Sequence, residues 1–198
     1  MKVEGLFPTP VYCNTINNPD VTKELDECYS SIDFRYYDKF KETHKLSPDP
    51  FDNNVITHYN LENFWKELDF NVNQYCTNVF NIEDYRYKIT NSWFSQFDKG
   101  DYGHTHNHGS SDLSGVYYCK TNGKDGNIFF ECPVEGMHSS HLFHKHIRRW
   151  EYEPAVGKLI LFPGFLRHGI FKNTTNNNRV SLSFNISFIP FRWGLDEV

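Results

Sequence analysis

The sequence predicts a mainly β protein with flanking helices, and two observations lead to this fold class. From about residue 84 onward, short strand-like segments recur at near-regular spacing and are separated by turn formers. An array of this kind is typical of a β-sandwich or a β-barrel. Two segments with helical periodicity precede the array, so we expect N-terminal helices packed on one face of it.

The strand candidates begin with an extended segment near the N-terminus. Residues 6–13 contain two prolines, which excludes a central strand and predicts an edge strand or a lead-in. Further strands are predicted at residues 85–94, 113–120, 127–131, 149–153, 158–162, 169–172 and 180–188. The dipeptides Asn122-Gly123 and Asp125-Gly126 are turn signals between the second and third of these later strands.

Two helices are predicted before the strand array. The first begins after Asn18, with Pro19 in its first turn. Its apolar face consists of Val21, Leu25, Cys28 and Ile32. The second begins after Asn60, which can cap it. Its apolar stripe consists of Leu61, Phe64, Trp65, Leu68, Val72 and Tyr75. Between the helices, residues 34–56 have weak periodicity, so we expect a loop with room for one irregular helix.

The length of 198 residues predicts one domain over residues 1–198. We expect residues 1–83 to form the N-terminal strand and helices, and residues 84–190 to form the β core. Residues 133–147 interrupt that core and predict a lid loop. The proline-bearing N-terminal segment could pair across a homodimer.

Charge and cysteine content restrict the function classes. A formal net charge of −5 at pH 7 argues against nucleic acid and anionic membranes as partners, because both require a basic surface. No apolar run approaches the roughly 18 residues that a membrane helix needs, and the N-terminus lacks a signal-peptide pattern. The five cysteines are odd in number and form no CxxC pair, so we expect reduced thiols and a cytoplasmic location.

Three histidines in five residues, His104, His106 and His108, indicate a metal site. In an extended chain, side chains two residues apart point the same way, so adjacent members of the trio could bind one ion together. Imidazole suits iron, copper, zinc and nickel. A polar surface loop is the alternative, since histidines also cluster there.

A further histidine, His168, follows the predicted strand at 158–162 and adds to the metal hypothesis. If Lys172 pairs with Arg179 across the turn at 173–178, His168 pairs with Ser183. The residues that then share the face of His168 are Arg179, Ser181, Ser183 and Asn185. The opposite, apolar face carries Val180, Leu182, Phe184 and Ile186. The polar face either meets water or lines a cavity, and in a cavity Arg179 would be a good carboxylate clamp.

The ordered set of motifs resembles the Fe(II)/2-oxoglutarate-dependent dioxygenases, and within them a small bacterial and phage subgroup. The motifs of this chain that match the subgroup are Gly100-Asp101-Tyr102, His106-Asn107-His108, Leu113-Ser114-Gly115-Val116-Tyr117-Tyr118, Phe162-Pro163, His168 and Arg179-Val180-Ser181-Leu182-Ser183-Phe184-Asn185. The opening Leu6-Phe7-Pro8-Thr9-Pro10 is also similar. The resemblance covers nearly the whole chain, most densely residues 91–188. It implies a double-stranded β-helix (jelly roll), in the cytoplasm of a bacterium or of a phage-infected bacterial cell.

Carried over residue by residue, the resemblance implies that His106 is the first metal ligand and His168 the distal one. Arg179 then binds the far carboxylate of 2-oxoglutarate with help from Ser181, and the residues assigned beside this cosubstrate are Tyr118 and Asn91. The implied cofactors are Fe(II), 2-oxoglutarate as cosubstrate, and O2. The implied reaction is hydroxylation of an unknown substrate, coupled to decarboxylation of 2-oxoglutarate to succinate.

One position departs from the wider family. Where that family has Asp or Glu, this chain has His108, and a neutral imidazole would leave the metal site one unit more positive. We expect His106, His108 and His168 to be the ligands, with Asp112, the nearest downstream carboxylate, in reserve.

The remaining candidates are placed around the mouth of the site. His104 and Trp93 are expected to contact the substrate or to line its entrance, although core packing is the alternative for Trp93, Tyr117 and Tyr118. The predicted lid contains His138, His141 and His144. A second metal site is the alternative for these lid histidines.

Three functions follow from these residues. The first is an Fe(II)/2-oxoglutarate oxygenase. The second is a cupin-like metalloenzyme with three histidines that does not use the keto acid. The third is a non-catalytic jelly-roll binding module. Arg179 with Ser181 favours the first over the second, because a cupin has no need of an arginine there.

Overall fold

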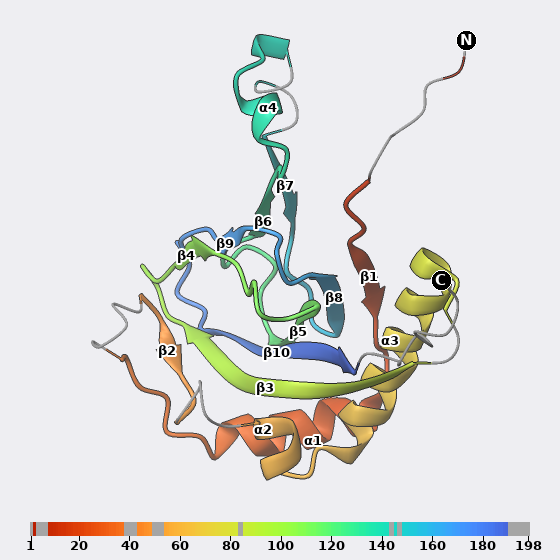
Figure 1. Ribbon diagram of the computed structural model, residues 1–198. Coiled ribbons are helices and arrows are strands. Elements are labelled where there is room, and N and C mark those ends of the chain that lie inside the picture. Colours follow the sequence, from red (N-terminus) through yellow and green to blue (C-terminus); the bar gives the residue numbers. More distant parts are fainter. Residues whose placement is uncertain are drawn as a thin grey trace.

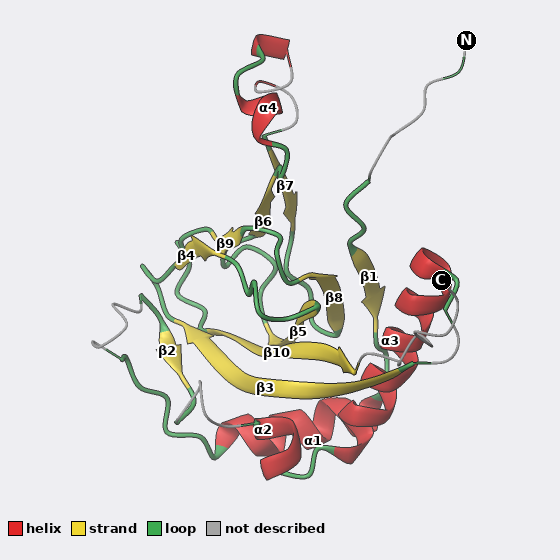
Figure 2. Ribbon diagram, in the orientation of Figure 1, coloured by secondary structure: helices red, strands yellow, loops and turns green. Residues whose placement is uncertain are grey.

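Two antiparallel β-sheets face each other, and helices cover the outer face of the larger sheet (Figure 1). This computed structural model describes residues 2, 8–37, 43–48, 54–82, 85–142, 145 and 148–189. The helices under the sheet and the strands above them are separated clearly when the chain is coloured by secondary structure (Figure 2). The expected packing of N-terminal helices on one face is therefore confirmed.

The larger sheet has six strands in the order β1-β8-β5-β10-β3-β2. Their bounds are β1 Tyr12–Thr15, β8 Lys158–Pro163, β5 Leu113–Lys120, β10 Arg179–Ile189, β3 Arg86–Phe97 and β2 Lys45–Leu46. All the pairs are antiparallel. The extended segment predicted at residues 6–13 contributes the edge strand β1, as expected for a proline-bearing segment; residues 6 and 7 lie outside the described part of the chain.

The smaller sheet has four strands in the order β4-β9-β6-β7. Their bounds are β4 Gly103–His106, β9 His168–Ile170, β6 Ile128–Glu131 and β7 Arg149–Tyr152. From β3 to β6 and again from β7 to β10, consecutive strands alternate between the two sheets. This alternation is that of the predicted double-stranded β-helix, so the fold class is confirmed.

The first helix has the predicted start. α1 spans Pro19–Ser30, and the Asn18 side chain accepts a hydrogen bond from the backbone nitrogen of Asp20 at 3.0 Å. The other helices are α2 Val55–His58, α3 Glu62–Phe80 and α4 Glu135–His138. The region expected to be loop contains the two-residue strand β2 and the start of the four-residue helix α2.

The core between the helices and the larger sheet is aromatic. The ring of Phe64 on α3 lies 5.3 Å from that of Tyr117 and 6.2 Å from that of Phe184, centroid to centroid. The apolar face predicted for β10 is buried in this core and consists of Val180, Leu182, Phe184 and Ile186. Tyr117 packs with it, so this tyrosine belongs to the core and not to the space between the sheets.

The start of α3 differs from the prediction. Asn60 does not cap the helix; it has a positive φ of 52°, and Leu61 occupies the N-cap position without a side-chain cap. The carboxylate of Glu24 on α1 instead accepts hydrogen bonds from the backbone nitrogens of Asn63 at 3.0 Å and Phe64 at 2.8 Å. A neighbouring helix therefore supplies the acceptor that the preceding residue normally supplies.

Replacement of Glu24 by alanine is expected to lower the free energy of unfolding by about 1 kcal/mol, the usual value of a lost N-cap. Urea denaturation measures this change. Glu27 is the matched control, since it lies on the same helix and makes only an exposed, 3.9 Å ion pair with Lys23. Equal stability of the two alanine variants would contradict the capping role of Glu24.

None of the helices in the described residues combines the length and the apolar character needed to cross a membrane.

Candidate metal centre and its cavity

A cavity of about 410 Å³ lies between the two sheets. Its lining comes from the facing sides of both sheets and includes Asn91, Trp93, His104, His106, His108, His168, Ser181, Ser183 and Asn185. These positions alternate along β3 and β10, as the strand periodicity requires. The polar face of β10 therefore lines a cavity, which was one of the two possibilities predicted for it; the other was that it faces water.

Three of the predicted ligands meet at this cavity. His106 on β4 is paired with His168 on β9, and their ring centroids are 4.4 Å apart. The ring of His108, two residues further along, lies 4.9 Å from that of His106 and 5.2 Å from that of His168. One ring nitrogen from each of the three lies within 4.8 Å of the others, and this is the one such group found among the described residues.

The strand pairing that brings them together is not the predicted one. β9 does not pair with β10; it pairs with β4 and β6, while β10 pairs with β3 and β5. The turn formers at 173–178 carry the chain from one sheet to the other, and the Asn173 amide fixes this crossing by donating to the carbonyls of Phe97 and Asn177. His168 and Ser183 consequently face the same cavity from opposite sheets.

Backbone carbonyls orient two of the three imidazoles. His106 Nδ1 lies 2.7 Å from the carbonyl oxygen of His104, and His168 Nδ1 lies 3.0 Å from that of Leu166. Because a carbonyl can only accept, each Nδ1 carries the proton and each Nε2 keeps its lone pair for a metal. This arrangement around the triad is typical of metal-binding histidines.

Two of the three imidazoles, those of His108 and His168, are neutral at neutral pH. Burial, with a smaller contribution from the neighbouring His106, lowers the pKa of His168 to about 3 and that of His108 to about 4. Both side chains therefore offer lone pairs at pH 7 without first losing a proton.

His108 is held through its backbone. Its amide donates to the carbonyl of Gly164 at 2.8 Å, and the Gly164 amide donates to the carbonyl of Asp112 at 3.1 Å. A Cβ on Gly164 would lie 2.1 Å from the carbonyl oxygen of Ser111, so only glycine allows this close approach of the β8–β9 turn to the histidine loop.

Asp112 is not brought to the triad. It is exposed, its carboxylate accepts a hydrogen bond from the Phe188 backbone nitrogen at 2.7 Å, and it lies outside the group whose ligand atoms converge. The donor set at the cavity is thus three imidazoles without a carboxylate.

Arg179 is completely buried and has donors to spare. Its Nη1 donates to the carbonyl of Gly126 at 2.6 Å, and its guanidinium lies 4.1 Å from the ring centre of Phe97. Within the described residues, its Nε and Nη2 atoms have no hydrogen-bond partner, and neither has the hydroxyl of Tyr118 nearby. Unsatisfied donors at such depth are costly unless a ligand pairs with them.

The charge at this end of the cavity is positive. Burial lowers the pKa of Arg179, but an arginine remains cationic in proteins. Burial raises the pKa of Tyr118 to about 12, so its hydroxyl stays protonated and can donate. The Arg179 guanidinium and the Tyr118 hydroxyl can both donate hydrogen bonds here, and the buried Ser181 lies two residues further along β10. Together these groups form a receptor for a carboxylate.

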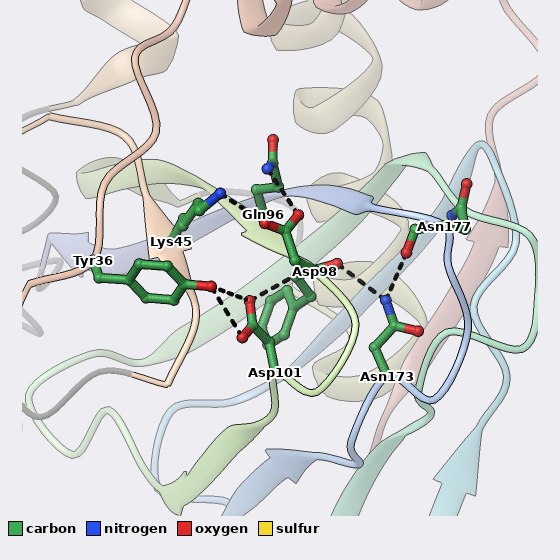
Figure 3. Close-up of polar contacts among 8 residues, drawn as sticks. Tyr36, Lys45, Gln96, Asp98, Asp101, Asn173 and Asn177 are labelled. Atoms are coloured by element: carbon green, nitrogen blue, oxygen red, sulfur yellow. Dashed lines mark hydrogen bonds and ion pairs between the residues drawn. The ribbon is translucent and has the colours of Figure 1, made fainter.

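Two polar networks hold this receptor in place. The fully buried Asp125 accepts from Thr121 Oγ1 at 2.6 Å and from Asn177 Nδ2 at 2.8 Å, which ties the loop that contacts Arg179 to the turn before it. Figure 3 shows the second network, in which Asp98 accepts from Lys45 and from Gln96 at the end of β3, and Asp101 accepts from Tyr36. Together they join the β3–β4, β5–β6 and β9–β10 connections around one end of the cavity.

The sequence patterns did not predict one of the residues that line the cavity, His44. His44 stacks on Phe97 with 4.2 Å between ring centroids and an interplanar angle of 7°. Burial, followed by the charge of Arg179, lowers its pKa to about 3, so it is neutral. His44 lies in the region of weak periodicity before β3, where no sequence pattern indicated a contact with the cavity.

The described part of the predicted lid lies apart from the triad. β6 and β7 continue as a ribbon that stands away from the two sheets, and α4 is at its tip (Figure 1). His141 is exposed there, the side chain of His138 is not described, and His144 lies outside the described residues.

Comparisons with known proteins were made for the sequence and for the fold. A family model described as "Putative 2OG-Fe(II) oxygenase" matches residues 91–185, the segment that contains the triad and Arg179. No curated protein sequence matches the chain.

Solved structures with the same fold are numerous but distant in sequence. A 2OG-Fe(II) oxygenase family oxidoreductase from Burkholderia pseudomallei is 14% identical with a TM-score of 0.60, over 84% of this chain and 77% of that one. HygX from Streptomyces hygroscopicus, solved with nickel, 2-oxoglutarate and hygromycin B, is 10% identical with a TM-score of 0.64, over 90% and 83%. A Pseudomonas putida prolyl-4-hydroxylase is 14% identical with a TM-score of 0.57, over 90% and 92%. At these identities the likeness concerns the fold alone.

Proposed function

We propose that the chain is a 2OG-Fe(II) oxygenase in which His106, His108 and His168 hold the iron and Arg179 binds 2-oxoglutarate. The cofactors are Fe(II), 2-oxoglutarate as cosubstrate, and O2. The observation that carries the assignment is the pair of unsatisfied buried donors on Arg179, whose guanidinium packs on Phe97, a residue that lines the same cavity as the three converging imidazoles.

The donor set fits a divalent transition metal. Three imidazoles, two of them fixed by carbonyls at Nδ1, suit Fe(II) as well as nickel, zinc and copper. With only three protein ligands, a metal held here would remain accessible to the keto acid and to O2. Bound together, Fe(II) and 2-oxoglutarate supply an oxidation by O2 in which the keto acid loses CO2 and becomes succinate.

The spacing along β10 fits the keto acid. Arg179 and Ser183 are four residues apart, which is about 13 Å at the usual rise of a strand. Trp93 is paired with Ser183, and its ring centre lies 5.9 Å from that of His108, so the triad is above this position of the sheet. A five-carbon dicarboxylate and an arginine side chain together span the remaining gap.

The protein's own residues would bind, orient and exclude water. Arg179 can pair with the far carboxylate through Nε and Nη2, while Tyr118 and Ser181 donate to it from β5 and β10. The carbonyls of Asp125 and Gly126 keep the guanidinium aimed, because they occupy its Nη1. Gly126 has a φ of +104° and a Cβ there would lie 2.2 Å from the Phe171 carbonyl oxygen, which fixes this loop tightly.

Turnover of 2-oxoglutarate tests the proposal directly. The purified protein, supplied with Fe(II), ascorbate, 2-oxoglutarate and O2, is expected to release succinate, measured by mass spectrometry. Slow release without a primary substrate is sufficient, since the keto acid decarboxylates uncoupled in the absence of its partner. Metal binding without keto-acid binding by calorimetry would instead support a cupin-like metalloenzyme, and absence of both would support a binding module.

The location and the lid remain part of this proposal. All five cysteines are free thiols, which supports a reducing compartment such as the cytoplasm of a bacterium or of a phage-infected cell. The segment 133–147, which joins β6 to β7 in the sequence, would act as the lid when a substrate binds. Deletion of residues 136–146 should then alter substrate use and leave uncoupled succinate release intact.

A further inference from the structure

The cavity floor is organised in successive cross-strand rows. β3, β10 and β5 lie side by side, and their registers align Asn91 with Asn185 and Ser114. The next inward-facing row contains Trp93 and Ser183, the following one Ser95, Ser181 and Tyr118, and the last one Phe97 and Arg179. Each row is about 7 Å from the next, because side chains on one face recur every two residues.

The metal triad divides this floor into two unequal parts. His108 lies next to Trp93, and the ring of His168 lies 4.7 Å from that of Phe162, which is paired with Ser114. The triad is therefore above the first two rows, and Arg179 is at the far end. The row with Asn91 is the end of this floor that lies farthest along the strands from Arg179 and so from the proposed position of the far carboxylate of the cosubstrate.

A chain of hydrogen bonds ends at Asn91. The Ser114 hydroxyl donates to Asn185 Oδ1 at 2.7 Å, and Asn185 Nδ2 donates to Asn91 Oδ1 at 2.9 Å. The acceptor of the Asn91 amide is thereby used and its orientation is set. Within the described part of the chain, the NH2 group of Asn91 donates no hydrogen bond, and Asn91 lines the cavity.

The charge of the lining adds a second constraint. Although the sequence contains 25 acidic residues, no Asp or Glu is among the described residues that line the cavity. An ammonium group placed beside Asn91 would thus meet an amide donor and would find no carboxylate to pair with. An oxygen acceptor, by contrast, would satisfy the NH2 group directly.

We propose that Asn91 is the polar anchor of the primary substrate and that it binds an uncharged or anionic carbonyl oxygen, that of a carboxamide or a carboxylate. This inference rests on the proposed function, since it defines the substrate side by the position of the triad and Arg179. Trp93, half-buried in the next row, forms the apolar wall against which the adjoining carbon skeleton of the substrate lies. Asn91, which the sequence analysis assigned to the cosubstrate, is here a substrate residue.

Three probes with one skeleton and different head groups test the class of substrate. Phenylacetamide, phenylacetate and 2-phenylethylamine are added in turn to the zinc-loaded protein saturated with 2-oxoglutarate, and their binding is measured by saturation-transfer NMR. The amide and the carboxylate are expected to bind at least about tenfold more tightly than the amine. Equal binding of all three, preference for the amine, or no binding of any probe at millimolar concentration would overturn the proposal.

The variant Asn91→Asp separates the substrate from the cosubstrate. Its carboxylate still accepts from Asn185 Nδ2 and has the same shape, but it has no donor for a carbonyl oxygen. It is expected to weaken the two oxygen probes about tenfold and to leave the Kd of 2-oxoglutarate, measured by calorimetry, unchanged. A tenfold loss of 2-oxoglutarate affinity would return Asn91 to the cosubstrate and overturn the inference.

Failure of the proposed function would be visible in the same experiment. If the zinc-loaded wild type does not bind 2-oxoglutarate, the oxygenase assignment fails, whereas the probes can still be compared on the metal-loaded protein alone. Oxygen-probe selectivity that disappears in Asn91→Asp would then still support Asn91 as a carbonyl receptor, and its persistence would exclude it.

Discussion

Alanine at position 168 is expected to abolish metal binding. His168 is 6% exposed and its ring is in contact with both other imidazoles, so its loss leaves two ligands and one fewer fixed tautomer. Mutation of residues that only support a metal ligand typically lowers the metal affinity about 10–100-fold. Loss of a ligand itself should therefore lower the metal affinity at least about 100-fold. The measurement is the iron or nickel content after anaerobic loading and desalting.

Two variants make this result decisive. His58→Ala removes an exposed histidine on α2, and its metal content is expected to equal that of the wild type. His168→Gln fills most of the volume of the imidazole and guards against unfolding of the alanine variant, since the side chain lies between Phe162 and Phe130. A folded His168→Gln protein that retains one metal ion per chain would refute the triad.

Methionine at position 179 is expected to eliminate 2-oxoglutarate binding while keeping the fold. The substitution removes the cation and its two unsatisfied donors but retains an unbranched side chain beside Phe97. A charge-assisted, buried pair is worth about 3–5 kcal/mol when one partner is removed, so the Kd should rise at least about 100-fold. Calorimetry on the zinc-loaded protein measures it.

Thermal unfolding with and without 2-oxoglutarate distinguishes a role of Arg179 in ligand binding from a purely structural role. For the wild type, 2-oxoglutarate at 100 times its Kd should stabilise the fold by about 2.7 kcal/mol and raise the Tm by roughly 5–10 °C. For Arg179→Met this increase should vanish, whereas the ligand-free Tm should stay near that of the wild type because a buried, unpaired charge has been removed. Arg86→Met, at the exposed start of β3, is the matched control. A Tm increase that survives in Arg179→Met would exclude the arginine as the carboxylate receptor.

The sequence by itself determined the local elements and most of the chemistry. Strand β5 has the predicted bounds, and the other predicted strands are present with shifts at their ends, because alternation and turn formers act over neighbouring residues. The spacing of His106 and His108 and the position of Arg179 between turn formers and serines are also local, and they were sufficient to indicate a metal site beside an anion site.

Only the tertiary structure decided how distant segments meet. The sequence pattern predicted a β9–β10 hairpin, yet the chain crosses between sheets there, because the Asn173 amide is bonded to the end of β3. The cap of α3 comes from Glu24 on another helix, and His44 reaches the cavity from a segment without periodicity. Likewise the two rows that separate Asn91 from Arg179 exist only after three strands have aligned. Such contacts join residues tens of positions apart, and the periodicity of one segment contains no information about which other segment will pack against it.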